Sequence, residues 1–203
     1  MSWLSRERLP EHLTTFRLWL GPVLLASSFF GEHPRFFLFA LLAGLLSDIF
    51  DGILARRFGV ATDALRAYDS RADLVFWLCV LATTWVVRPA EVAEHAGPIT
   101  AVLGAEGASH ATSLLRFGRL ASAHALLSKA YAVSLFTGLA ALLCFGLTGG
   151  WLMTAVNLGI AANVDCVLIL LLLPSWQRDI PSCWHAWRVR RGLPIRRNPL
   201  FHG

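Results

Sequence analysis

Charged residues and cysteines are both scarce in this chain of 203 residues. Aspartate, glutamate, lysine and arginine make up only 15% of it, whereas 56% is hydrophobic. The mean hydropathy of +0.57 is unlike that of an ordinary soluble domain and indicates a membrane protein. The few cysteines are scattered without a CxxC spacing, which argues against a disulfide framework and a zinc site. They are Cys79, Cys144, Cys166 and Cys183.

Features that are typical of secreted, repeat or nucleic-acid-binding proteins are missing as well. The charged start MSWLSRERLPEHL runs straight into an apolar segment, so we expect no cleavable signal peptide and a first segment that stays as an anchor. The chain contains no evident internal repeat or low-complexity tract, and no fold-specific nucleic-acid motif. We therefore expect a single domain over residues 1–203 and no nucleic-acid partner.

Apolar runs recur along the chain and predict an all-α fold, an integral membrane bundle of six transmembrane helices. Glu106, Ser109 and His110 lie within the fourth run, and they leave open a broken or partly interfacial helix there. The six predicted helices cover residues 13–30, 36–55, 72–88, 98–116, 128–147 and 151–173.

Basic residues predict how the bundle is oriented. All but two of the 18 lysines and arginines fall on one side of the predicted membrane, and the exceptions are Arg35 and Arg88. By the positive-inside rule both termini face the cytoplasm, in a multi-pass protein that we expect in a bacterial inner membrane. Residues 1–12 form an interfacial start around Trp3. Residues 175–203 form a basic tail that favours anchoring to anionic headgroups over nucleic-acid binding.

Four aspartates lie at the junction of the second and third apolar runs. Asp48 and Asp51 are spaced i and i+3, and Asp69 and Asp73 are spaced i and i+4, so each pair shares a helix face. Carboxylates this close repel one another unless a cation lies between them, and hard divalent ions prefer oxygen ligands. Solvated helix caps are the structural alternative for any one aspartate, but they explain four at this spacing poorly. We therefore expect a site for Mg²⁺ or Mn²⁺, with two ions, at the cytoplasmic face.

The pattern DxxDGxxAR followed by DxxxD resembles the signature of the CDP-alcohol phosphatidyltransferase family. The resemblance implies a phospholipid-synthesising transferase that moves a phosphatidyl group from CDP-diacylglycerol to a small polar alcohol and releases CMP. It also implies a homodimer among membrane lipids. Asp48, Asp51, Asp69 and Asp73 correspond to metal ligands, and Asp73 is also the candidate catalytic base.

The same resemblance assigns a nucleotide and diphosphate site. Asp48, Gly52, Ala55 and Arg56 form it, with the small residues admitting the nucleotide and Arg56 meeting the diphosphate. Independently, arginine suits phosphate because it forms forked hydrogen bonds. The chain departs from the family at Leu65, where a glycine is usual, and a leucine side chain there would reshape the nucleotide pocket.

The acceptor alcohol is less well defined by the sequence. DSRAD, with Leu74 after it, is similar to phosphatidylserine synthases and favours serine or another polyol. A basic set on the predicted cytoplasmic side would instead suit a polyol phosphate, although membrane anchoring explains it equally well. The acceptor-side candidates are Arg17, Arg116, Arg119 and Lys129.

Two other hypotheses about the function of the acidic residues remain open. A cation or proton transporter would use the same carboxylates, with Glu106 and Asp165 as relay groups. A catalytically inactive scaffold is the second, and Leu65 is its support. For Asp165 we favour a structural role, in which it pairs with a neighbouring helix. His110 is best explained by hydrogen-bonded packing, because nothing near it has zinc-ligand spacing.

Overall fold

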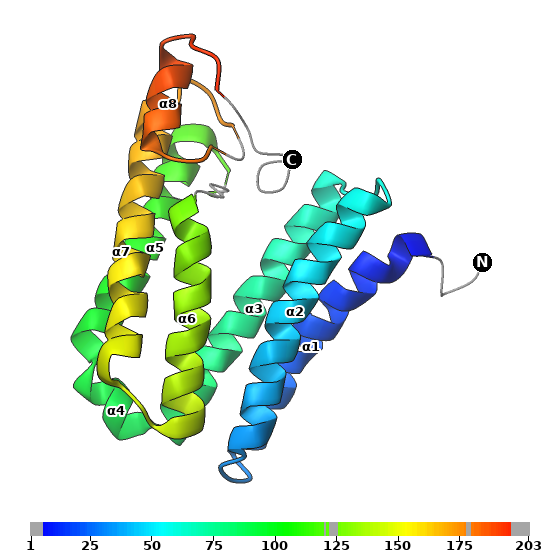
Figure 1. The fold of residues 1–203 in the computed structure, drawn as a ribbon, viewed down its shortest axis with the longest axis vertical. Coiled ribbons are helices and arrows are strands. Elements are labelled where there is room, and N and C mark those ends of the chain that lie inside the picture. The colour runs from blue at the N-terminus through cyan, green and yellow to red at the C-terminus, as the bar shows by residue number, and fades with distance from the viewer. Residues whose placement is uncertain (1–5, 120, 122–125, 178–179, 196–203) are drawn as a thin grey trace. The chain divides into compact units, whose positions relative to one another are not determined.

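The computed structural model describes residues 6–119, 121, 126–177 and 180–195, and it is helical without strands in these ranges. The chain forms two compact units, Met1–Val92 with Leu139–Leu147 and Ala93–Gly138 with Thr148–Gly203. Figure 1 shows the helices along the chain. The all-α prediction is confirmed, whereas the single domain stays a prediction. Several residues of the predicted interfacial start and basic tail lie outside the described ranges: Trp3, Arg178, Arg196 and Arg197.

The first unit is built on three long helices. A short 3-10 turn, Arg6–Arg8, leads into α1 (Leu9–Ser28), which is followed by α2 (Pro34–Arg57) and α3 (Asp63–Val87). Helix α1 packs against both α2 and α3 (Figure 1). Residues on the inner face of α1 therefore lie between the two helices that carry the aspartates.

A tight connection joins α2 to α3. Gly59 has a positive φ of 69°, which glycine adopts without strain, and its N–H bonds to the Arg56 carbonyl. The Val60 N–H bonds to the Ala55 carbonyl at 3.0 Å, so α2 ends in a Schellman motif. Helix α3 then starts at Asp63, earlier than the predicted 72, because Thr62 caps it by accepting from the Leu65 N–H. The early start makes Asp69 helical.

Two glycines and one phenylalanine fix the spacing of the three helices. A Cβ added at Gly44 would lie 2.3 Å from the Phe76 ring, and one at Gly21 would lie 3.0 Å from the Phe76 Cα. The Phe76 side chain is buried, so this is core packing. Neither glycine can accept a side chain unless its neighbours move.

The second unit contains α5 (Ala96–Phe117), α7 (Gly149–Leu172) and α8 (Cys183–Arg190). Helices α4 (Pro89–Glu94) and α6 (Leu126–Phe145) each contribute residues to both units. Helix α7 packs against α5 and α8. A buried apolar cluster ties the end of α7 to the segment that contains α8; it consists of Ile169, Leu173, Ile180 and Ala186.

Four of these helices are long and apolar enough to cross a membrane, which supports a membrane protein. They are α2, α3, α6 and α7. Helices α1 and α5 occupy the positions predicted for the first and fourth spans, but they are not among the four. Charged residues such as Glu11 and Glu106 make both less apolar, and α5 is nevertheless one continuous helix. Six spans and cytoplasmic termini stay predictions.

Candidate functional site

Three of the predicted aspartates form one cluster in the first unit. Asp48 and Asp51 come from α2 and Asp69 from α3, and one carboxylate oxygen of each lies within 4.8 Å of the others. The aspartates of the cluster differ in exposure to solvent. Only 5% of the Asp51 side chain is exposed, whereas 45% of the Asp48 side chain is exposed. The cluster therefore has a buried floor and an open side, as a site that admits a ligand requires.

Arg17 lies at the centre of the cluster. The guanidinium is 3.0 Å from Asp48, 3.4 Å from Asp51 and 2.9 Å from Asp73, and it also pairs with Asp69. Only 1% of the Arg17 side chain is exposed. In the structure Arg17 is the shared partner of all four aspartates, and the acceptor-side role that the sequence suggested for it stays a prediction.

Arg17 also shows how Asp73 relates to the other aspartates. The Asp73 carboxylate is not one of the three that converge within 4.8 Å. It approaches the Arg17 Nε at 2.9 Å, although not with hydrogen-bond geometry. The position of Asp73 at the edge of the cluster is compatible with its predicted role as a base, which stays a prediction.

The structure adds polar residues of α1 that the sequence did not single out. The Thr14 hydroxyl lies 2.9 Å from an Asp51 carboxylate oxygen, to which it can donate. The Thr15 hydroxyl is 2.9 Å from the Tyr68 hydroxyl on α3. Thr14 and Arg17 are spaced i and i+3, so one polar face of α1 meets the aspartates. Two polar residues at helical spacing in an apolar segment were the available signal.

The predicted diphosphate residues continue from the cluster along α2. Ala55 is buried and Arg56 is exposed. A Cβ added at Gly52 would lie 3.6 Å from an Arg56 guanidinium nitrogen, so the two residues share one face. Leu65 lies in the first turn of α3, one turn before Asp69, and it is partly buried. Its side chain is thus on the helix face that leads to the cluster.

Three predicted acceptor-side residues belong to the second unit. Arg116 donates to the Leu171 carbonyl at 2.8 Å and to the Leu173 carbonyl at 3.1 Å, so it satisfies carbonyls at the end of α7. Arg119 packs over the Trp176 ring at 5.1 Å. Lys129 is partly buried in α6. The contacts of both arginines are structural, and an acceptor role for any of the three stays a prediction.

The remaining ionisable residues of the second unit have local partners. The Asp165 carboxylate accepts from the Cys183 N–H at 3.0 Å, at the start of α8, which agrees with the expected pairing to a neighbouring helix. Asn163 donates to Glu106 at 3.2 Å and to the Gly159 carbonyl at 3.0 Å. Together with Ser109 and His110, Glu106 and Asn163 line a cavity of about 150 Å³.

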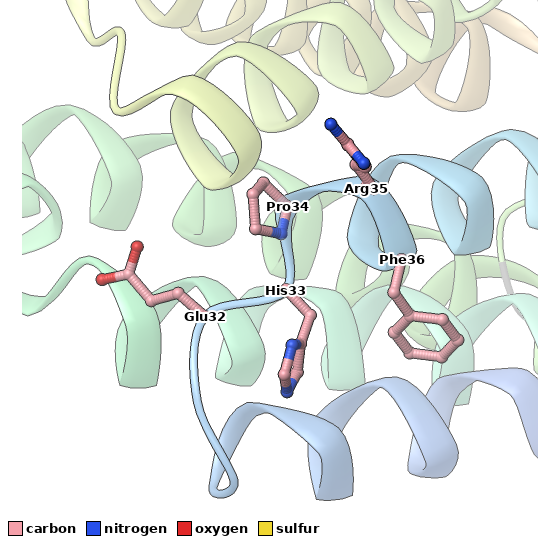
Figure 2. Close-up of a pocket in the computed structure, with 5 residues that line it drawn as sticks. All are labelled: Glu32, His33, Pro34, Arg35 and Phe36. Atoms are coloured by element: carbon pink, nitrogen blue, oxygen red, sulfur yellow. The ribbon is translucent and has the colours of Figure 1, made fainter.

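A larger hollow lies in the first unit, at the end of α2 away from the aspartates. It has a volume of about 400 Å³ and is lined by residues 32–36. Figure 2 shows that these side chains point in different directions and do not converge on one point. Glu32 is paired with Arg88 at 2.9 Å. Neither the geometry nor the chemistry of this hollow suggests a reaction.

The aspartate cluster fits a divalent cation. Its ligand atoms are carboxylate oxygens, which Mg²⁺ and Mn²⁺ prefer, and they converge from two helices. The cationic group of Arg17 among them shows that the cluster attracts positive charge. Four carboxylates and one guanidinium still leave an excess of negative charge. Metal ions bound there, with the basic Arg56 further along α2, could hold and polarise a phosphate-containing substrate.

One comparison with known proteins bears on this geometry. A family model described as CDP-alcohol phosphatidyltransferase matches residues 7–173. The match includes α1, α2 and α3 and therefore every residue of the aspartate cluster. No curated protein and no solved structure gives a significant match.

Proposed function

Because this chain belongs to the CDP-alcohol phosphatidyltransferase family, we propose that it makes a phospholipid from CDP-diacylglycerol and a small polar alcohol, releasing CMP. The family's reaction is the transfer of a phosphatidyl group from a CDP-alcohol to an acceptor. The observation that carries the proposal is the convergence of carboxylates from α2 and α3, with Arg56 further along the same face of α2 as Asp48 and Gly52.

The aspartates and the residues of the diphosphate site have separate roles in this proposal. Asp48, Asp51, Asp69 and Asp73 would hold two divalent ions. Bound there, the ions would neutralise the diphosphate and stabilise charge on the phosphorus oxygens. Arg56 would form forked hydrogen bonds to the diphosphate, and the absent side chain of Gly52 leaves room beside it.

The attacking hydroxyl needs a base, and Asp73 is the best placed carboxylate. It lies at the edge of the cluster and 34% of its side chain is exposed, so an alcohol can approach it. A proton taken from the alcohol at this carboxylate leaves an oxygen that attacks the diacylglycerol-linked phosphorus. The bond from that phosphorus to the CMP oxygen breaks, and CMP leaves.

For the acceptor we favour serine or another unphosphorylated polyol. Arg116 is engaged by backbone carbonyls and Arg119 by an aromatic ring, so the described contacts give no support for a phosphate clamp built from them. The DSRAD sequence, which continues with Leu74, points the same way. We further propose a cytoplasmic active site, from the distribution of basic residues, and a homodimer, from the family.

Release of CMP by purified protein tests the proposal directly. The protein would be incubated with Mg²⁺ or Mn²⁺, CDP-diacylglycerol or another CDP-alcohol, and a panel containing serine, inositol, glycerol and glycerol 3-phosphate. We expect CMP with CDP-diacylglycerol and an unphosphorylated acceptor. No CMP from any pair would contradict the proposed activity, and ion flux in liposomes without CMP would favour a transporter.

A variant at position 65 tests whether the protein is an enzyme or an inactive scaffold. Leu65→Gly restores the residue that is usual in the family at the start of α3. If the wild-type site is functional, both proteins release CMP and differ in donor preference. Activity in the variant alone would identify the natural protein as catalytically degenerate.

A further inference from the structure

Arg17 occupies the space in which a cation would be held by the aspartates. We propose that the Arg17 guanidinium and divalent ions are alternative occupants of this cluster, so that ion binding expels the guanidinium from it. The proposal rests on the divalent-ion site of the proposed function and adds a competitor that belongs to the chain itself. Arg17 would then act as a resident counterion of the ion-free protein.

Distances make simultaneous occupancy unfavourable. The guanidinium nitrogens approach oxygens of Asp48, Asp51 and Asp73 at 2.9 to 3.4 Å. An Mg²⁺ ion needs oxygens at about 2.1 Å in a near-octahedral arrangement, so the carboxylates must close on it. The same oxygens cannot surround both a planar guanidinium and a compact ion.

Charge acts in the same direction. A guanidinium in contact with the ligands of a divalent ion would lie only a few ångströms from that ion, and repulsion is strong in a buried site. Without the ion, removal of Arg17 would take away the guanidinium that lies among four neighbouring carboxylates, which is also unfavourable. The position of the Arg17 guanidinium among the carboxylates is thus favourable in the ion-free protein and unfavourable once an ion is bound.

The expelled side chain remains available to the site. Arg17 is carried by α1, which packs against both aspartate helices, so its guanidinium stays near the cluster after release. Arginine binds phosphate oxygens through paired hydrogen bonds. Ion binding would therefore convert a group buried among carboxylates into one that can meet an anionic substrate.

A purely structural role for Arg17 predicts a different result. If the guanidinium only positions the aspartates, its removal should scatter the ligands and weaken ion binding. If it competes with the ion, removal should strengthen ion binding. The direction of the change distinguishes the two roles.

Chemical labelling of the wild-type protein gives the first test. Phenylglyoxal modifies accessible arginines, and peptide mass spectrometry reports the modification at each site. We expect Arg17 to be protected in EDTA and modified at least several-fold faster with saturating Mn²⁺, while exposed Arg66 reacts equally in both. Unchanged or stronger protection of Arg17 while Mn²⁺ is bound would overturn the proposal.

Direct Mn²⁺ binding to variants gives the second test. Arg17→Gln removes the competing charge, and we expect it to lower the Mn²⁺ dissociation constant by about tenfold. Arg66→Gln, which changes an exposed arginine of the same unit, should have no such effect. An unchanged or higher dissociation constant for Arg17→Gln contradicts the exchange.

The two tests also separate this proposal from the proposed function. Absence of Mn²⁺ binding in both wild type and Arg17→Gln would overturn the metal-dependent function and the exchange together. Mn²⁺ binding with CMP release but with Arg17 still protected would overturn the exchange alone. Labelling uses the wild-type protein, so it decides the question even if Arg17→Gln fails to fold.

Discussion

Each unit of the molecule contains a polar cluster with at least one partly exposed carboxylate between its helices, and the two clusters differ in the partners of those carboxylates. In the second unit, Glu106 accepts from Asn163, which in turn bonds to the Gly159 carbonyl. In the first unit, four carboxylates share the guanidinium of Arg17. The second cluster is a local network around one carboxylate, which also lies 3.7 Å from His110, whereas the first brings four carboxylates to one guanidinium.

From this difference we infer that the second cluster is structural, and that the first, called the functional cluster below, is the proposed site. Buried polar groups that satisfy one another contribute to packing and need no ligand. A cluster with excess charge is unfavourable by itself and becomes favourable when a cation binds, so its imbalance indicates a ligand. An acidic residue inside a membrane helix is therefore informative only when its partners have been counted.

The largest expected effect breaks the functional cluster. Asp51→Asn keeps the shape of a buried ligand but removes its charge, and we expect CMP release to fall by about 100-fold or more. Glu106→Gln makes the same chemical change in the second unit and should alter CMP release by less than about threefold. Equal losses in both variants, measured with matched protein folding, would contradict the distinction between the clusters.

Removal of divalent ions should lower the thermal stability of the protein, and the loss should depend on the aspartates of the first unit and not on Glu106. An ion at 100 times its dissociation constant stabilises the folded state by about 2.7 kcal/mol. Thermal unfolding in detergent should therefore shift to higher temperature when Mg²⁺ replaces EDTA. The shift should persist in Glu106→Gln and disappear in Asp48→Asn/Asp69→Asn. A shift of equal size in that double variant would place the stabilising ion elsewhere.

The close packing of Gly44 against Phe76, which supports the functional cluster, should not tolerate an added methyl group. Gly44→Ala places a methyl group against the Phe76 ring, and we expect a loss of about 2 kcal/mol in unfolding free energy. Gly104→Ala is the matched control, because a Cβ there meets nothing within 4 Å and alanine favours the helix. Chemical denaturation in detergent measures both. Equal stability of the two variants would contradict the close packing at Gly44.

The smallest expected effect breaks the structural cluster. Asn163→Ala removes the amide that donates to Glu106, and we expect unfolding free energy to fall by about 1 kcal/mol while specific activity is retained. Asn157→Ala, which changes an exposed asparagine of the same helix, should be neutral. Loss of CMP release in Asn163→Ala at unchanged stability would show that the second cluster also serves the reaction.

Helical periodicity explains why much of the site could be predicted. The spacings of Asp48 and Asp51, and of Asp69 and Asp73, place each pair on one face wherever the segments are helical. Both segments are helical in the structure. The apolar runs likewise predicted the long helices, because their periodicity and length are local properties of the sequence.

Parts of the site that depend on contacts between distant segments could not be predicted from the sequence. Arg17 precedes its partner Asp48 by 31 residues, and nothing local indicates that α1 lies between α2 and α3. The role of Thr14 depends on the same packing. The start of α3 depended on a smaller detail, the cap supplied by Thr62, which extended the helix beyond its apolar run.

Phe76 connects the interior of the first unit to the geometry of its site. The glycines that contact it, Gly21 and Gly44, each lie one helical turn from a residue of the cluster, Arg17 and Asp48, and Phe76 lies one turn from Asp73. Phe76 thus acts as a spacer between the ligands, with its backbone against Gly21 and its ring against Gly44. Ligand chemistry and ligand spacing are consequently encoded by different residues, so either can be altered while the other is kept.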